Sequence, residues 1–114
     1  SVEDLVKGWR PFKSKLSAWA ARNDLRYVIT EVGYPSRTRG AFRPWAYDVK
    51  AAPDLDLQRR CYESLRRVWA DDPRLKGMFL WNWFGKGGPE DSGYTPRGKP
   101  AEGVLRSWWG AQAH

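Results

Sequence analysis

A single glutamate, Glu31, is the residue in this sequence best placed to do chemistry. It lies in residues 26–32, a run rich in β-branched side chains that is typical of a buried strand. Alternation along this strand predicts that Glu31 shares a face with Ile29. A buried carboxylate needs a partner, so one interpretation is an ion pair with Arg37 or Arg43 of the following loop. The other is a catalytic carboxylate in the mouth of a barrel, and position alone leaves both open.

Tryptophans near the end of a second apolar run are candidates for ligand binding. Residues 77–84 have the length of a strand and suit a parallel strand covered on both faces. Alternation places Trp81 and Trp83 on one face, beside a glycine-containing loop. An indole at such a place can stack on the apolar face of a sugar ring, or it can be core. We expect a ligand platform at Trp81 or Trp83.

Counts of the other reactive residues narrow the chemistry. The chain has 114 residues, one cysteine, Cys61, and one histidine, His114. An internal disulfide is therefore impossible, and a histidine-based triad or a His/Cys zinc site is implausible. Neither a cofactor nor a metal is implied. Carboxylates, tyrosines or lysines would have to carry any reaction.

Five elements are expected to position these residues. Helical spacing predicts a short turn before Pro11, an interruption there, and a helix up to about residue 20. Asp54 suits the cap of a second helix, and Pro100 suits the first turn of a third. With the two strands between them, the order is helix, strand, helix, strand, helix, which implies βα units of a parallel sheet. Five tryptophans fall on helical apolar stripes and are expected to pack: Trp9, Trp19, Trp69, Trp108 and Trp109.

The loops add a direction to this arrangement. The connections that leave the two strands are long, at residues 34–53 and 85–99, whereas those that enter them are short. Long loops at the carboxyl ends of parallel strands are where (β/α)8 barrels and open α/β sheets place their sites. Two strands leave unprotected edges, and a whole barrel takes about 250 residues. We therefore expect the chain to be the C-terminal portion of a larger domain, rather than a small self-sufficient α/β domain.

Composition excludes several other classes of protein. With 41% apolar and 15% aromatic residues the chain can build a core, so disorder is excluded. The formal charge of +7 raises nucleic acid as a partner, but the basic residues are dispersed, usually near an acid, and no nucleic-acid-binding motif is present. We expect a solvated basic surface and no nucleic acid. No stretch approaches the roughly 20 apolar residues of a membrane span, so no membrane partner is expected, and the compartment stays open.

Five segments together resemble one known family. In order and spacing, the chain is similar to the C-terminal part of glycoside hydrolase family 113, (β/α)8 (TIM) barrels of clan A that include β-mannanases. The resemblance covers nearly the whole chain. It rests on residues 29–36, 43–47, 56–63, 77–84 and 94–101.

The resemblance implies a role for each part of the chain. Residues 1–114 would be the C-terminal fragment of one catalytic domain, with residues 26–32 as strand seven and residues 78–84 as strand eight of the barrel. Glu31 would match the nucleophile of a retaining mechanism, in which a second carboxylic acid protonates the leaving oxygen. In clan A that acid follows an asparagine after strand four, and no Asn-Glu pair occurs here. The fragment would thus hold half of a catalytic pair.

The function expected from the sequence is a retaining, endo-β-1,4-mannanase-like hydrolase that is active only with the missing N-terminal part of the barrel. Its partners would be that part and a polysaccharide or oligosaccharide. Secretion or export would need a signal peptide in the missing part. Sugar contacts are expected from Trp81, with Tyr34, Trp83 and Asn82 as further candidates. The alternatives are a non-catalytic carbohydrate-binding module and, less favoured, a basic nucleic-acid-binding domain.

Overall fold

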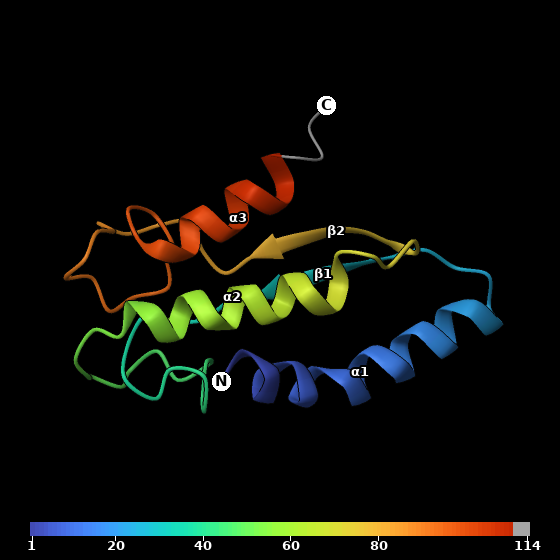
Figure 1. The fold of residues 1–114 in the computed structure, drawn as a ribbon, viewed down its shortest axis with the longest axis horizontal. Helices are drawn as coiled ribbons and strands as arrows, with labels where there is room; N and C mark the ends of the chain where they lie inside the picture. Colours follow the sequence, from blue (N-terminus) through green and yellow to red (C-terminus); the bar gives the residue numbers. More distant parts are fainter. Residues whose placement is uncertain (111–114) are drawn as a thin grey trace.

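The structure is a computed structural model that describes residues 1–110 and has the expected order of elements. Three helices alternate with two strands (Figure 1). In chain order they are α1 (Val2–Arg22), β1 (Tyr27–Val32), α2 (Leu55–Trp69), β2 (Leu75–Leu80) and α3 (Pro100–Gly110). Both expected helix starts are present, because the Asp54 carboxylate accepts the Leu57 backbone N–H at 2.9 Å and Pro100 is the first residue of α3.

The two strands form a parallel pair. Ile29 lies opposite Met78, and Val32 lies opposite Leu80. The strands run in one direction and the helices run back, so the long loops that leave the strands lie together at one end of the molecule, on the left of Figure 1. The predicted βα units are therefore confirmed. This parallel arrangement differs from the antiparallel sandwich that is typical of carbohydrate-binding modules.

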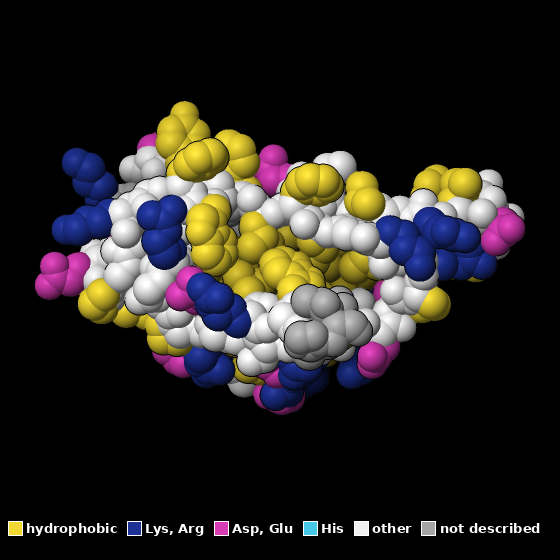
Figure 2. Space-filling view, turned by 90° about the horizontal axis from the view of Figure 1, so that it is seen from above, with side chains coloured by type: hydrophobic (Ala, Val, Ile, Leu, Met, Phe, Trp, Pro, Cys, Tyr) yellow, Lys and Arg dark blue, Asp and Glu magenta, His cyan; other side chains and the backbone are white. Residues whose placement is uncertain are grey.

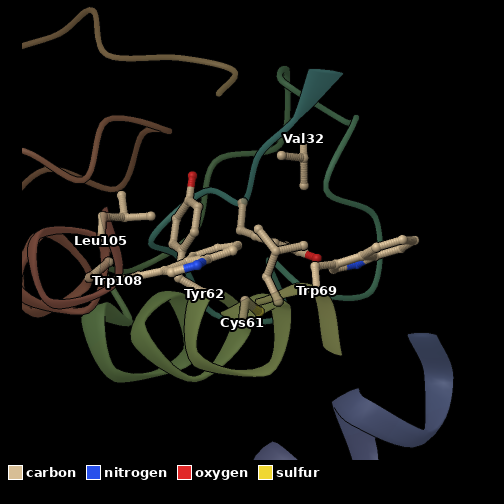
Figure 3. Close-up of a cluster of buried hydrophobic side chains, with 9 residues drawn as sticks. Val32, Cys61, Tyr62, Trp69, Leu105 and Trp108 are labelled. Carbon is tan, nitrogen blue, oxygen red and sulfur yellow. The ribbon is translucent and has the colours of Figure 1, made fainter. Parts of the chain in front are cut away.

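The apolar stripe of α2 forms the centre of the core. Cys61, Tyr62, Leu65 and Trp69 are all buried there and cluster with Val32 of β1 (Figure 3). Helix α3 completes the cluster with Ala101, Leu105 and Trp108. Burial raises the pKa of the Cys61 thiol to about 12, so this cysteine is a packing residue rather than a nucleophile.

The helices cover only one face of the strand pair, so the expectation that both faces are covered does not hold within this chain. On the other face, Val28 and Phe79 leave 48% and 63% of their surface exposed. Met78, Trp108 and Trp109 line a pocket beside β2. Seen from above, the molecule has a hollow in which hydrophobic side chains gather (Figure 2). A single globular domain rarely leaves so much apolar surface open.

Helix α1 continues through Pro11, where an interruption was expected. Proline removes one backbone hydrogen bond, but the turns on both sides are held because Leu5, Trp9 and Leu16 pack against the core. Pro11 itself is exposed to solvent. Trp19, expected to pack, is exposed near the end of this helix, and the other four helical tryptophans are buried or half-buried.

Strand β2 begins and ends earlier than the sequence indicated. Its pairing starts with Leu75 opposite Tyr27, and the backbone N–H of Trp81 donates to the Val32 carbonyl at 2.8 Å. Because β1 ends at Val32, residues beyond Trp81 have no strand to pair with. Trp81 and Trp83 therefore do not share a strand face. No helix within residues 1–110 is long and apolar enough to cross a membrane.

The exposed face generates the first prediction. We expect residues 1–114, produced alone, to self-associate, because unpaired strand edges and apolar side chains such as Val28 and Phe79 are open to other copies. Analytical ultracentrifugation and thermal denaturation measure this. A monodisperse monomer that unfolds cooperatively would contradict the prediction.

Candidate functional site

Glu31 lies at the carboxyl end of β1, on the side away from the core. From Ile29 to Val32, β1 advances three residues while β2 advances two, from Met78 to Leu80, so the register is irregular here. Ile29 and Val32 both pack with the core, and Glu31 is exposed. The alternation that placed Glu31 on the face of Ile29 was therefore wrong, because it assumed a regular strand.

One interpretation of the sequence was that Glu31 forms an ion pair with a loop arginine. The structure does not contain this ion pair. In the described part of the chain, Glu31 forms no ion pair with Arg37, Arg43 or another base. Arg37 instead donates to the backbone carbonyl of Ala46. Because the Glu31 carboxylate is exposed, its charge needs no buried partner.

The carboxylate opens into an aromatic pocket of about 460 Å³. Glu31 is the only acidic residue among those that line it, and Trp81, with half of its surface exposed, lies on the wall. The lining comes from α1, the end of β1 and the loops that follow both strands: Trp9, Glu31, Val32, Gly33, Tyr34, Pro44, Trp45, Tyr47, Trp81 and Tyr94. A carboxylate surrounded by flat aromatic rings suits a ligand with hydroxyls and apolar CH faces.

Close contact between two backbones places Trp81 beside Glu31. Gly33 follows β1 directly, and a Cβ atom built on it would overlap the carbonyl oxygen of Trp81. The absence of a side chain at Gly33 therefore allows the end of β2 to approach the end of β1. This contact brings together the two residues that the sequence singled out.

The other expected site residues are more dispersed. Tyr34 lines the pocket, but it is buried and its ring packs edge-on against Tyr62. Asn82 is half-buried outside the lining. Trp83 lies in a separate pocket beside Leu105 and Trp109 of α3.

Sequence reasoning missed four aromatic residues of the pocket. Trp9 was assigned to packing because it falls on a helical stripe, yet it reaches the pocket from α1. Trp45, Tyr47 and Tyr94 lie in the long loops, where periodicity carries no information. The signal available for these three was their aromatic character in loops that leave the ends of parallel strands.

A buried glutamine joins the two long loops. Gln58 of α2 donates from Nε2 to the carbonyl of Tyr34, at 2.9 Å, and to that of Tyr94, at 3.0 Å. Tyr94 in turn donates its hydroxyl to the carbonyl of Pro44. Hydrogen bonds to the backbone carbonyls of Tyr34, Tyr94 and Pro44 thus fix three segments of the pocket wall. A backbone carbonyl keeps its position whatever rotamer its own side chain adopts.

A buried lysine makes a second connection behind the pocket. Lys99 Nζ donates to Ser36 Oγ at 2.8 Å, to Asp91 Oδ1 at 3.1 Å and to the Gly93 carbonyl at 3.1 Å. Desolvation lowers the pKa of Lys99, although Asp91 opposes this shift. Burial acts to raise the pKa of Asp91, but the backbone N–H groups of Gly93 and Gly87, together with Lys99, outweigh it and lower the pKa. Asp91 is therefore charged at neutral pH, and the Lys99 amine lies within hydrogen-bond distance of it.

Within residues 1–110 no three residues of the types His, Cys, Asp and Glu come close enough to hold a metal ion. His114 lies outside the described residues.

A parallel βα pair with a carboxylate at the carboxyl end of its first strand defines a piece of an α/β barrel or an open α/β sheet. Residues 2–99 match Glycoside Hydrolase Family 113. Because this match covers most of the chain, the protein belongs to that family. A comparison with curated proteins gave no match.

Solved structures of the same family share the fold. A GH113 β-mannanase from Alicyclobacillus acidocaldarius, solved in complex with ManMIm, is 34% identical with a TM-score of 0.79 over 92% of this chain. A GH113 β-1,4-mannanase described as a complex structure is 24% identical, with a TM-score of 0.82 over 96% of this chain. In both comparisons the chain spans 36% of the other protein's length. The chain therefore has the fold of about a third of such a TIM barrel enzyme.

The contact at Gly33 yields the second prediction. Gly33→Ala should destabilise the protein by about 1–3 kcal/mol and displace Trp81, because the added methyl group overlaps a backbone carbonyl. Gly103→Ala is the matched control: nothing lies within 4 Å of a Cβ atom there, and alanine in α3 should stabilise by about 0.4–1 kcal/mol. Chemical denaturation and Trp fluorescence measure both. Equal effects of the two substitutions would contradict the assigned contact.

The third prediction concerns pH. The folded-state pKa of Asp91 is below its ordinary value of 3.8, so the stabilisation it contributes is complete above about pH 4 to 5 and is lost as the pH falls through the lower folded-state pKa. Asp91→Asn should cost about 1–3 kcal/mol at pH 7 and progressively less in acid. Denaturation curves from pH 7 to pH 2.5 measure the difference. A difference that stays constant over this range, or that equals the effect of Asp48→Asn on the exposed loop, would contradict it.

Proposed function

We propose that this chain is the C-terminal part of a retaining glycoside hydrolase, with β1 and β2 as strands seven and eight of a (β/α)8 barrel. Residues 1–114 would then belong to one catalytic domain, whose remaining strands pair with the open edges of β1 and β2. The proposal is supported by the parallel pair, its bare face and the share of the family's structures that the chain covers.

The observation that carries the proposal is the position of Glu31. It is the only acid lining an aromatic pocket at the carboxyl end of a parallel strand, and no base pairs with it among the described residues. That end of the strands is where barrel enzymes carry their catalytic groups. An exposed carboxylate that lines the pocket is accessible to the anomeric carbon of a bound sugar.

In the proposed mechanism Glu31 is the nucleophile. Its carboxylate attacks the anomeric carbon as the glycosidic bond breaks, and a glycosyl-enzyme ester forms. A second carboxylic acid, about 5–5.5 Å away, protonates the leaving oxygen and then activates the water that cleaves the ester. The pocket lining holds no second acid, so this group would come from the rest of the barrel. The 114-residue chain alone would be inactive.

The proposed substrate is a β-1,4-linked mannan or a related polysaccharide, cleaved within the chain. The mannanase structures of the family support this class of substrate. Trp81 would stack on the sugar unit beside Glu31, since its indole is half-exposed on the pocket wall. Tyr34, Trp83 and Asn82 stay predicted sugar contacts, although only Tyr34 of the three lines the pocket.

The fourth prediction tests this role. In the full-length protein, Glu31→Gln should lower kcat on β-1,4-mannan by several orders of magnitude with little change in folding, as the loss of a covalent catalyst does. Glu90→Gln is the matched control, because Glu90 is an exposed carboxylate in the loop after β2 that lies outside the Glu31 pocket. Reducing-sugar assays and circular dichroism measure activity and folding. A Glu31→Gln enzyme that keeps a tenth of the activity would refute the assignment.

A further inference from the structure

Three arginines of the loop after β1 surround a second pocket, which we name the arginine pocket. Its volume is about 420 Å³. It is lined by Arg37, Thr38, Arg39, Phe42, Arg43, Val49 and Ala51. Three arginines therefore line one cavity, and no acidic residue is among its lining residues.

The guanidinium groups of this pocket are held in place before any ligand arrives. Arg37 is buried and donates to the Ala46 carbonyl. Arg39 and Arg43 each lie over the ring of Phe42, with the guanidinium carbon 5.5 Å and 5.7 Å from its centroid. Such contacts already restrict these long side chains in the free protein. A bound ligand therefore causes a smaller loss of side-chain conformational entropy.

These arginines differ from those of α2. On α2, two arginines pair with Asp56 and two with Glu63, at 2.7–2.8 Å. Among the described residues, by contrast, Arg37, Arg39 and Arg43 have no carboxylate within 4.0 Å. Like charges gathered in one cavity repel each other, and an anion removes this repulsion. The pocket is therefore complementary to a negatively charged group.

The arginine pocket adjoins the Glu31 pocket. Arg43 lines the first, and Pro44 and Trp45 line the second, so the chain separates them by at most about 7 Å between Cα atoms. Trp45 and Tyr47 are largely exposed on the same loop. A saccharide chain bound over these aromatic rings would extend from Glu31 toward the arginines.

We propose that the arginine pocket binds the carboxylate of an acidic sugar unit, a uronate, carried by the polysaccharide a short distance from the bond that is cleaved. The guanidinium fork matches the two oxygens of a carboxylate, and Phe42 offers an apolar surface beside them. The pocket would make the enzyme prefer acidic or oxidised mannans to neutral ones. This inference rests on the function proposed above.

The test compares two ligands that differ only in charge. Neutral manno-oligosaccharides and the same oligosaccharides oxidised at C6 to carboxylates are titrated into the full-length protein by calorimetry at low salt. The oxidised ligand should bind about tenfold more tightly or better. Arg39→Gln/Arg43→Gln should remove this preference and leave the affinity for the neutral ligand unchanged. Arg26→Gln, at the opposite end of β1, removes one exposed positive charge and should keep the preference.

The outcomes separate this inference from the proposed function. If the neutral ligand binds and is hydrolysed but the oxidised ligand is not preferred, the inference alone fails. If neither oligosaccharide binds, both proposals fail. A preference that survives the double substitution also overturns the inference. Inorganic phosphate or duplex DNA that binds through Arg39 and Arg43 while the oxidised ligand gains nothing would assign the pocket to another anion and likewise overturn it.

Discussion

The parallel pairing of β1 with β2 is the constraint on which the rest of the structure depends. Parallel strands cannot be joined by a tight turn, so α2 must return the chain across their face, and its apolar stripe becomes the core. The same pairing brings the carboxyl ends of both strands to one edge. Gly33 lets the two backbones meet there, so that Glu31 and Trp81 share a pocket although 49 residues separate their places in the chain. The pairing is incomplete, because both outer edges and one face of the pair remain open.

The pocket is built from loops, and buried polar groups take the place of regular structure in holding them. Gln58 binds one carbonyl from each long loop, and Lys99 ties Ser36 of the first loop to Asp91 and Gly93 of the second. Compared with an apolar pair of similar volume, a buried ion pair of this kind adds little net stability, although removing one partner alone is costly. The ion pair and its hydrogen bonds instead set geometry, because all of them can form together in only one arrangement of the two loops. The proposed binding of a sugar ring against Glu31 would need such a fixed arrangement.

Sequence pattern predicted those features that depend on local order. The stripe of α2, the caps at Asp54 and Pro100, and the strand around Glu31 all follow from periodicity and turn chemistry, and the structure contains them. The failures share a cause in tertiary packing. Packing of α1 on the core carries the helix through Pro11, the irregular register turns Glu31 away from Ile29, and the end of β1 ends β2 before Trp83. Trp45, Tyr47 and Tyr94 could not be assigned to the pocket, because a loop sequence has no periodic pattern from which the path of the loop can be predicted.

In the function proposed for this protein, the Glu31 carboxylate attacks the anomeric carbon of the sugar. A direct test is to trap the covalent intermediate in the full-length protein with a 2-deoxy-2-fluoro-β-mannosyl fluoride. The fluorine at C2 slows both the formation and the hydrolysis of the glycosyl-enzyme ester, and the good fluoride leaving group at C1 speeds formation alone, so the ester accumulates. Peptide mass spectrometry then locates the label. We expect one sugar per protein, attached to Glu31, and loss of activity in step with labelling. A label on a different carboxylate, or full labelling of a Glu31→Gln variant, would contradict it.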